Sequence, residues 1–314
     1  MGSISSHRFF ASLAGLLTSS MVLAATDEAP LPAPAGENAE LAHARELMAH
    51  GQFEEAKKAF EEIVSADVRS RGPQDARTLA DRVELAIACS KDGDYIKAED
   101  DLRDLLVIFN RRCGPDHKVT VRCRTALARV LYDAQRPHEA AKEYRQILDS
   151  QERVLGADDI EVARTRHGLG NALSIGGEYG EAIQQFRQAQ VLFDKVLGGD
   201  NFETLLNRSN LALVQAENRE YDAAEKELKA ILAIREQLSG QNDVSVLMTC
   251  FQLGRVLGGA RKYDEALTYA SRAEVGLRSA LNPEDRKISD AEGLCNQLRT
   301  DMAALRPKAP VVIP

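Results

Sequence analysis

The chain has 314 residues with a formal net charge of −8, and 44% of its residues are hydrophobic. Its 40 Lys and Arg residues are interspersed among 48 Asp and Glu residues, so it lacks the concentrated basic excess with which a nucleic-acid-binding surface displaces counterions. A chain of this length forms either two globular domains or one elongated array of repeats.

The first 24 residues have the layout of a secretory signal. Arg8 precedes an apolar run from Phe9 to Leu23, and small residues lead to a cleavage position after Ala24. Because this run is shorter than the ~20 apolar residues that a membrane-spanning helix needs, the pattern favours a cleaved signal peptide over a retained anchor. We therefore expect a periplasmic or secreted mature protein that begins with a flexible linker over residues 25–37.

A repeat of 42 residues occupies most of the remaining chain. Similar stretches such as "HGQFEEAKKAF" and "GGEYGEAIQQF" share an aromatic residue that is followed three positions later by alanine. The aromatic positions are Phe53, Tyr95, Tyr179, Tyr221 and Tyr263, with Pro137 in the vacant slot, and the alanines are Ala56, Ala98, Ala140, Ala182, Ala224 and Ala266. An aromatic ring beside a methyl group suits a close antiparallel crossing of two helices. The aromatic position is therefore predicted to begin the second helix of each repeat.

A first helix is predicted before each aromatic position, because leucine recurs there with apolar residues at i and i+4. The leucines are Leu85, Leu127, Leu169, Leu211 and Leu253. Between repeats the same spacing gives Gly72, Gly114, Gly156, Gly198 and Gly240, and then Asn282. Glycine or asparagine can end a helix in the left-handed conformation, and the polar residue two positions later, Asp116, Asp158, Asp200 or Asn242, can cap the next helix. Each repeat is thus predicted to hold two helices of roughly 16 residues.

These repeats resemble tetratricopeptide repeats. The 42-residue period, with "VLGADD" or "RCGPDH" between units, is similar to the repeats of kinesin light chains. The resemblance covers about Glu37 to Ser279 and implies an all-α, right-handed α-solenoid of about six antiparallel helix pairs, whose first helices line a concave groove for peptides or protein partners. We assign the array to residues 38–281, a C-terminal capping helix to residues 282–305 and a flexible tail to residues 306–314.

The sequence offers no catalytic, metal-binding or cofactor-binding motif. HExxH, G-x-S-x-G and Walker sequences are absent, and "GLGNAL" at Gly168 falls within a predicted helix rather than after a strand. The five cysteines have neither the spacing of a zinc cluster nor that of a redox pair. Buried thiols are the simpler interpretation, and a disulfide between Cys113 and Cys123 is the open alternative. We predict neither enzyme activity nor a cofactor.

Arginine recurs three residues before the leucine of the first helix, at Arg82, Arg124, Arg166 and Arg208. This spacing places each guanidinium on the packed side of its helix, where it needs a polar partner or a route to the surface. We expect a structural ladder in which these arginines bond to loop aspartates or helix-end carbonyls. A role in binding a ligand is the alternative.

The opposite face of the first helices carries the functional signal. Positions five before, two before and two after each leucine project away from the core, and these fifteen positions hold four Arg, one His and no acid. Charge of one sign beside exposed apolar residues is typical of a binding surface. Asn171 and Asn210 resemble the asparagines of the carboxylate-clamp type of tetratricopeptide domain. The candidate peptide-binding residues are Arg122, Arg129, Arg164, His167, Asn171, Asn210, Phe251 and Arg255.

These patterns predict a non-catalytic, exported module that binds an acidic, partly apolar, extended segment of another protein. A ligand ending in an EEVD-like sequence is not favoured, because His167, Met248 and Gln252 stand where a carboxylate clamp has basic residues. Nucleic acid is not an expected partner, and no membrane span is expected after signal removal. The alternative is a structural or assembly scaffold of the cell envelope that acts through its convex face or its tails.

Overall fold

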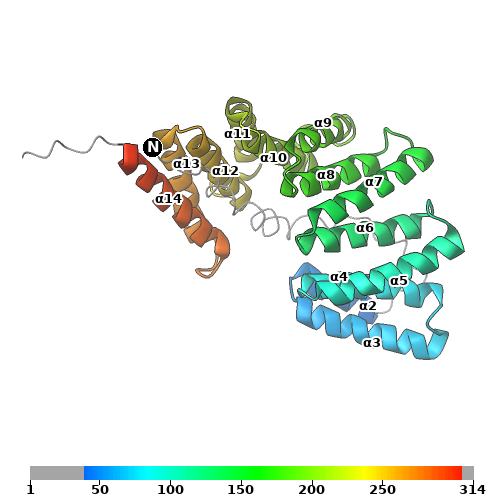
Figure 1. Cartoon of the computed structure of the whole chain (residues 1–314). Helices are drawn as coiled ribbons and strands as arrows, with labels where there is room; N and C mark the ends of the chain where they lie inside the picture. The colour runs from blue at the N-terminus through cyan, green and yellow to red at the C-terminus, as the bar shows by residue number, and fades with distance from the viewer. Residues whose placement is uncertain (1–38, 306–314) are drawn as a thin grey trace, which may run out of the picture. The chain divides into compact units, whose positions relative to one another are not determined.

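The computed structural model describes residues 39–305, and within them the chain forms thirteen α-helices and no β-strand (Figure 1). The predicted signal peptide (1–24), linker (25–37) and C-terminal tail (306–314) lie outside the described residues. The chain divides into two compact units between Glu178 and Tyr179. We call the helices before this division unit 1 and those after it unit 2.

Unit 1 is a series of helices in which each one contacts the next along the chain, and α4 also contacts α6. Its helices are α2 (Ala39–Ala49), α3 (Phe53–Arg71), α4 (Ala76–Lys91), α5 (Tyr95–Cys113), α6 (Lys118–Asp133), α7 (Pro137–Val154) and α8 (Ile160–Ile175). A stack of helix pairs produces this pattern, in which a helix contacts mainly the helices directly before and after it in sequence.

Unit 2 continues the same pattern. Its helices are α9 (Tyr179–Val196), α10 (Phe202–Glu217), α11 (Tyr221–Ser239), α12 (Val244–Gly259), α13 (Tyr263–Ala280) and α14 (Arg286–Leu305). Helix α12 contacts both α10 and α14, and α14 also packs on α13. The last helix therefore packs on the final helix pair, and its role as a C-terminal cap stays a prediction.

Small residues at the helix crossings set the distance between paired helices. Each second helix begins at the predicted aromatic position, or at Pro137 in α7, and the alanine three residues later has 0% exposure in all six repeats. Where α12 crosses α13, a Cβ atom on Gly254 would lie 3.1 Å from the Cβ of Ala270. Because larger side chains would not fit there, these positions explain the packing, and the predicted all-α solenoid of antiparallel helix pairs is confirmed.

The connections between repeats confirm the predicted glycine role and correct the predicted caps. The five glycines from Gly72 to Gly240 have φ between +83° and +92°. Asn282 does not adopt the left-handed conformation, because the C-cap residue of α13, Leu281, already has extended backbone. The N-cap residues are one position later than predicted, since the third residue after each glycine is the one with extended φ and ψ. These caps are Asp75, His117, Asp159, Asn201 and Asp243, and each side chain accepts a hydrogen bond from a backbone N–H two residues later.

Helix lengths also differ from the prediction. The first helices α4, α6, α8, α10 and α12 have 16 residues, as expected, whereas α2 has 11. The second helices have 18 or 19 residues. The second helices are longer because they continue to the residue next to the inter-repeat glycine or one short of it, instead of ending a turn earlier.

A second series of left-handed residues lies in the turns within each repeat, again every 42 residues. Gly51, Gly93 and Gly177 occupy it in three repeats, and Gln135, Arg219 and Arg261 in the other three, with φ of 59°, 67° and 63°. A residue with a Cβ atom is strained in this conformation. These turns were not predicted from the sequence, because only three of the six left-handed positions are glycine.

Replacing Gln135 with glycine is expected to raise the free energy of unfolding by up to ~1 kcal/mol, because glycine removes the strain of the left-handed conformation. Ala134 is a suitable control because its φ is −74°, so glycine there only adds freedom to the unfolded chain and should destabilise slightly. Thermal melts of both variants measure the difference. A Gln135→Gly variant no more stable than Ala134→Gly would contradict the strain at this turn.

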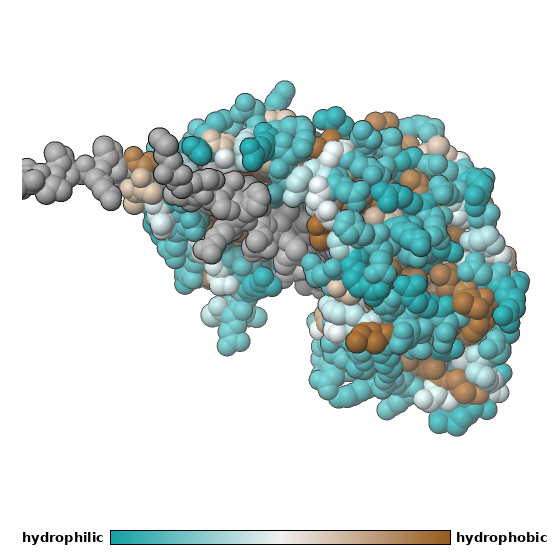
Figure 2. Space-filling model, viewed as in Figure 1, coloured by the Kyte–Doolittle hydropathy of each residue, from teal (hydrophilic) through white to brown (hydrophobic). Residues whose placement is uncertain are grey.

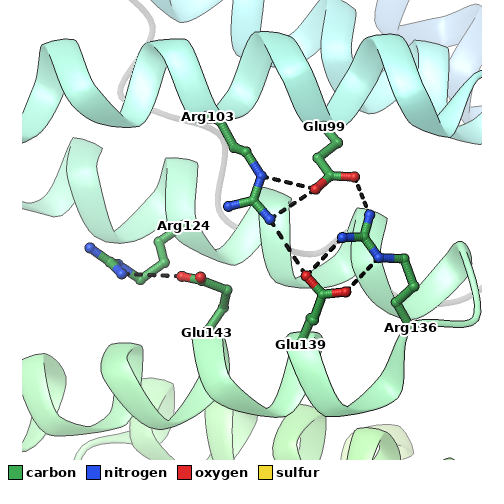
Figure 3. A network of polar contacts seen from close by, with 6 residues as sticks. All are labelled: Glu99, Arg103, Arg124, Arg136, Glu139 and Glu143. Carbon is green, nitrogen blue, oxygen red and sulfur yellow. Dashed lines mark hydrogen bonds and ion pairs between the residues drawn. The ribbon is translucent and has the colours of Figure 1, made fainter.

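Ion pairs join the second helices of neighbouring repeats in unit 1. Figure 3 shows Glu99 and Arg103 of α5 interleaved with Arg136 and Glu139 at the start of α7. Arg103 Nη2 lies 2.8 Å from Glu99 and 3.8 Å from Glu139, and Arg136 Nε lies 2.7 Å from Glu139. The hydrogen bond from Arg136 lowers the pKa of Glu139. Such exposed pairs are weak singly, but as a network they fix the register of adjacent repeats.

Candidate functional site

The candidate residues lie on one face of the first helices, which we call the first-helix face. In unit 1 it is formed by α4, α6 and α8, and in unit 2 by α10 and α12 with α14 beside them.

Arg122 of α6 is half-buried on this face and is paired with an acid. Its Nη2 atom donates to Glu84 Oε1 of α4 at 2.6 Å, and Arg45 of α2 lies 3.9 Å from the same oxygen. Glu84 is one residue before Leu85, a position that the three chosen spacings leave out. The predicted absence of acids on this face is therefore corrected. The column one before each leucine holds Glu84, Ala126, Gly168, Asn210 and Gln252.

The remaining candidates of unit 1 differ in their burial and in whether they form ion pairs with other side chains. Arg164 of α8 is paired with Glu161 one turn earlier. Asn171 is 7% exposed, whereas His167 is half-buried. Arg129 of α6 is half-buried and makes no ion pair or hydrogen bond with any residue between 39 and 305. Its charge is consequently the one in this candidate set that the described chain does not compensate.

In unit 2 the candidate residues are buried, which corrects the predicted exposure. Asn210, Phe251 and Arg255 are 4%, 4% and 8% exposed. Phe251 and Arg255 belong to α12, which packs against α10, α11, α13 and α14 and so has little open surface. Helical spacing alone could not reveal this, because the covering helix α14 follows the last repeat in sequence. A ligand-binding role for these three residues stays a prediction.

Buried charges meet where α10, α12 and α14 come together. Arg255 forms a 3.9 Å ion pair with Glu217, the last residue of α10. Burial raises the pKa of Glu217 to about 7, and the Arg255 charge opposes this shift. Burial also raises the pKa of Asp290 on α14, whose Oδ2 atom is buried without a hydrogen bond. The charge of Arg255 is therefore compensated by the carboxylates of Glu217 and Asp290. Arg255 is a poorer site for a ligand anion than the sequence pattern indicates.

The arginine column is structural, as expected, but its partners differ from those predicted. Arg82 lies 3.4 Å from Asp101, Arg124 lies 3.1 Å from Glu143, and Arg208 contacts Glu227. Each of these acids is 19 residues after its arginine, on the following second helix, as Figure 3 shows for Arg124 and Glu143. Arg166 instead contacts Glu152 of α7. The acids paired with Arg82, Arg124 and Arg208 thus lie on the paired helix and not in a loop.

The cysteines and the surface offer no further chemical site. Cys113 is exposed, Cys123 is buried, and all five cysteines are free thiols; burial raises the pKa of Cys123 to about 12. Within residues 39–305, no three His, Cys, Asp or Glu side chains are placed to hold a metal ion. In the same stretch no helix is long and apolar enough to cross a membrane. The face seen in Figure 2 is mainly hydrophilic, with hydrophobic residues in small separate groups.

A hollow of about 640 Å³ lies in unit 2, away from the candidate residues. It is lined by Asn242, Leu247, Ser271, Arg272, Val275, Gly276, Ser279 and Ala280. Gly276 stands at the repeat position where earlier repeats have Leu192 and Ile234. A Cβ atom on Gly276 would clash with the side chain of Leu247, so the glycine makes room for Leu247 beside the hollow.

Comparisons with known proteins agree with this architecture. Two family models, both described as tetratricopeptide repeat, match the chain, one over residues 82–152 and 125–195 and the other over residues 41–109. No curated protein matches the sequence at a significant level.

Several solved structures share the fold. The nearly identical TPR-like repeats of a Podosopora anserina protein assigned as a kinesin light chain are 20% identical, with a TM-score of 0.60 over 64% of this chain and 95% of that one. BtubC (BKLC) from P. vanneervenii is 20% identical, with a TM-score of 0.59 over 83% and 96%. A Rap protein is 11% identical, with a TM-score of 0.55 over 84% and 74%. With its 42-residue period and its paired helices, the chain belongs to the tetratricopeptide repeat family.

Proposed function

We propose that the chain is a non-catalytic, exported binding module whose unit 1 takes an acidic, partly apolar, extended segment of another protein on its first-helix face. Tetratricopeptide repeats are protein–protein interaction modules, and this family membership supports the general role. The Rap protein of similar fold was solved in complex with Competence and Sporulation Factor, which supports binding of a ligand by such an array.

The arginines of α6 carry the proposal. Arg129 makes no hydrogen bond or ion pair within residues 39–305, and Arg122 lies on the same helix two turns earlier, where it is paired with Glu84. Together, Arg122, Arg129 and Glu84 carry a net positive charge. Beside them, Ile87 of α4 is a half-buried apolar side chain. Guanidinium groups bind carboxylates through forked hydrogen bonds, and apolar neighbours add affinity for a segment that is not purely acidic.

Fluorescence anisotropy with a defined peptide tests this function. The probe has the sequence of residues 26–37, "TDEAPLPAPAGE", which is acidic, apolar and proline-rich, and its control carries Asn and Gln in place of Asp and Glu. The acidic peptide should bind more tightly, and added salt should weaken it. Deleting Thr26 to Glu37 from the chain should tighten binding, because the tethered copy competes at high effective concentration. Equal binding of the neutral peptide would overturn the proposal.

Export is part of the proposal and has its own prediction. The mature chain is expected to begin near Ala25, because small residues precede this point and the acidic linker follows it. Intact-mass spectrometry of the protein recovered from its native compartment measures this directly. A mass that retains Met1 to Ala24 would contradict both cleavage and the assigned compartment.

A scaffold acting through the second helices is the second candidate. Val191 of α9 and Val275 of α13 occupy equivalent repeat positions and are each 66% exposed, and Val275 also lines the hollow on α13. Exposed apolar side chains at periodic positions suit a partner on this surface. Val275→Glu should abolish association if this candidate is right, and it should leave binding of the acidic peptide unchanged if the first-helix face is the site.

A further inference from the structure

Polar pairs occupy the same place at two junctions between repeats, α7–α8 and α11–α12, whereas α5–α6 has Phe109 with Cys123 there and α9–α10 has Phe193 with Asn207. A residue near the end of a second helix meets the residue 14 positions later on the next first helix. In unit 1, Thr165 Oγ1 donates to Gln151 Oε1 at 2.6 Å, and in unit 2, Arg235 Nη1 donates to Thr249 Oγ1 at 2.7 Å. Both junctions are therefore satisfied by a donor and an acceptor. The corresponding pair between α3 and α4 is Asp67 and Asp81, which places two carboxyl groups at one junction.

Asp81 is buried and Asp67 is half-buried, and both carboxyl groups lie near one guanidinium nitrogen. The side chains of Asp67 and Asp81 are 14% and 5% exposed. Arg77 Nε lies 3.4 Å from Asp67 Oδ2 and 3.9 Å from Asp81 Oδ2. Neither Oδ2 atom, nor Arg77 Nε, makes a hydrogen bond within residues 39–305. The α7–α8 and α11–α12 junctions each pair a hydrogen-bond donor with an acceptor. The α3–α4 junction instead has two acceptors and too few donors.

The charges around the pair make one shared proton favourable. Arg71 Nε of α3 lies 3.4 Å from Asp67 Oδ1, but its side chain is 47% exposed and screened by water. Glu84, one turn after Asp81 on α4, adds further negative charge. Burial, followed by the neighbouring Asp67, raises the pKa of Asp81 to about 7. A proton on one carboxyl group would supply the missing donor and leave a single negative charge beside Arg77.

We propose that Asp67 and Asp81 form a proton-dependent clasp, which holds the first repeat, α2 and α3, against α4 and loosens when the shared proton is lost. The clasp adjoins the proposed binding face, because Arg45 of α2 lies beside Glu84, which in turn binds Arg122. Loosening the first repeat moves Arg45 away from this face and lowers its positive charge. This effect on binding rests on the proposed function, whereas the clasp itself does not.

The sign of the pH effect follows from where the proton binds more tightly. In the closed junction the pKa of Asp81 is about 7, and in the opened chain it returns to about 4. The closed form therefore holds more protons, and closure is favoured fully below about pH 4. It weakens by up to about tenfold per pH unit up to about pH 7 and levels off above that.

Hydrogen exchange of the full chain at pH 5, 6, 7 and 8, corrected for intrinsic rates, measures the clasp. Protection of α3 and of the start of α4 should fall steeply from pH 5 to 7, while the α7–α8 junction, with its neutral Gln151 and Thr165, should not show this slope. Asp81→Asn supplies a permanent donor to Asp67 and should flatten the α3 profile. Asp67→Asn supplies a permanent donor to Asp81 and should also flatten the α3 profile. It is the variant to use if Asp81→Asn misfolds.

Two results would overturn the clasp. One is an α3 profile as flat as that of the α7–α8 junction, and the other is an unchanged slope in both asparagine variants. Anisotropy of the acidic peptide over the same pH range tests the link to binding separately. A steep α3 profile with pH-independent peptide binding would leave the clasp standing and overturn its effect on the binding face. Absence of any peptide binding would instead overturn the proposed function.

Discussion

Replacing Ala266 with leucine is expected to lower the free energy of unfolding by ~1–3 kcal/mol, with a clear fall in melting temperature. Ala266 has 0% exposure on α13, and its carbonyl oxygen would lie 3.2 Å from a Cβ atom on Gly254 of α12. Three extra carbon atoms at this crossing would force the two helices apart. Because each repeat is stabilised mainly by its neighbours, the loss should extend to the packing of α14 on this pair.

Thr268→Leu is the matched control for this prediction. Thr268 lies on the same helix and is exposed, so leucine there should change the melting temperature little. Thermal melts followed by circular dichroism compare the two variants. Equal, small effects would mean that the alanine column does not set the distance between the paired helices.

Reversing the charge of Arg129 is expected to weaken binding of the acidic peptide by about tenfold, since the substitution removes one attraction and adds one repulsion of ~0.5–1 kcal/mol each. Arg129 is preferable to Arg122 and Arg164, because glutamate at those positions would also break the ion pairs with Glu84 and Glu161. The Arg129→Glu variant therefore separates loss of ligand attraction from loss of internal contacts. Anisotropy titrations at low salt measure the change.

Arg111 provides the control of equal charge change. It is exposed on α5 and has no partner within residues 39–305, so Arg111→Glu alters the net charge of unit 1 by the same amount at a different place. Its binding should change less than twofold. Comparable losses in the two variants would indicate general attraction to the whole chain, and unchanged binding in Arg129→Glu would exclude this residue from the site.

The architecture was predictable because it depends on short-range, repeated constraints. The aromatic and alanine columns mark helix starts and crossings, and Gly72 and its equivalents mark helix ends, all within one 42-residue period. The caps were misplaced by one residue because Asp158 and Asp159 are both capable of capping, and only the backbone conformation after Gly156 decides between them. The turn at Gln135 was missed because a residue other than glycine hides the left-handed position.

The site was less predictable, because it depends on contacts between repeats. Glu84 reaches Arg122 across 38 residues, and Phe251 is buried by helices that include one beyond the last repeat. Neither fact follows from the position of a residue within its own helix. The pairing of Asp67 with Asp81 was likewise not predictable from either helix alone. It depends on which residues meet at a junction between repeats, as residues 14 positions apart do at the α7–α8 and α11–α12 junctions.

Site-specific photocrosslinking tests the central claim, that the first-helix face of unit 1 is the binding surface. A photoreactive phenylalanine analogue is placed at Ile87, which is half-buried on the first-helix face, or at Val107, which is 58% exposed on the second helix α5. Each full-length variant is irradiated with the labelled acidic peptide, and the crosslinked product is quantified. The account predicts crosslinking from position 87 and little from position 107. Crosslinking from position 107 alone, or equally from both, would contradict it.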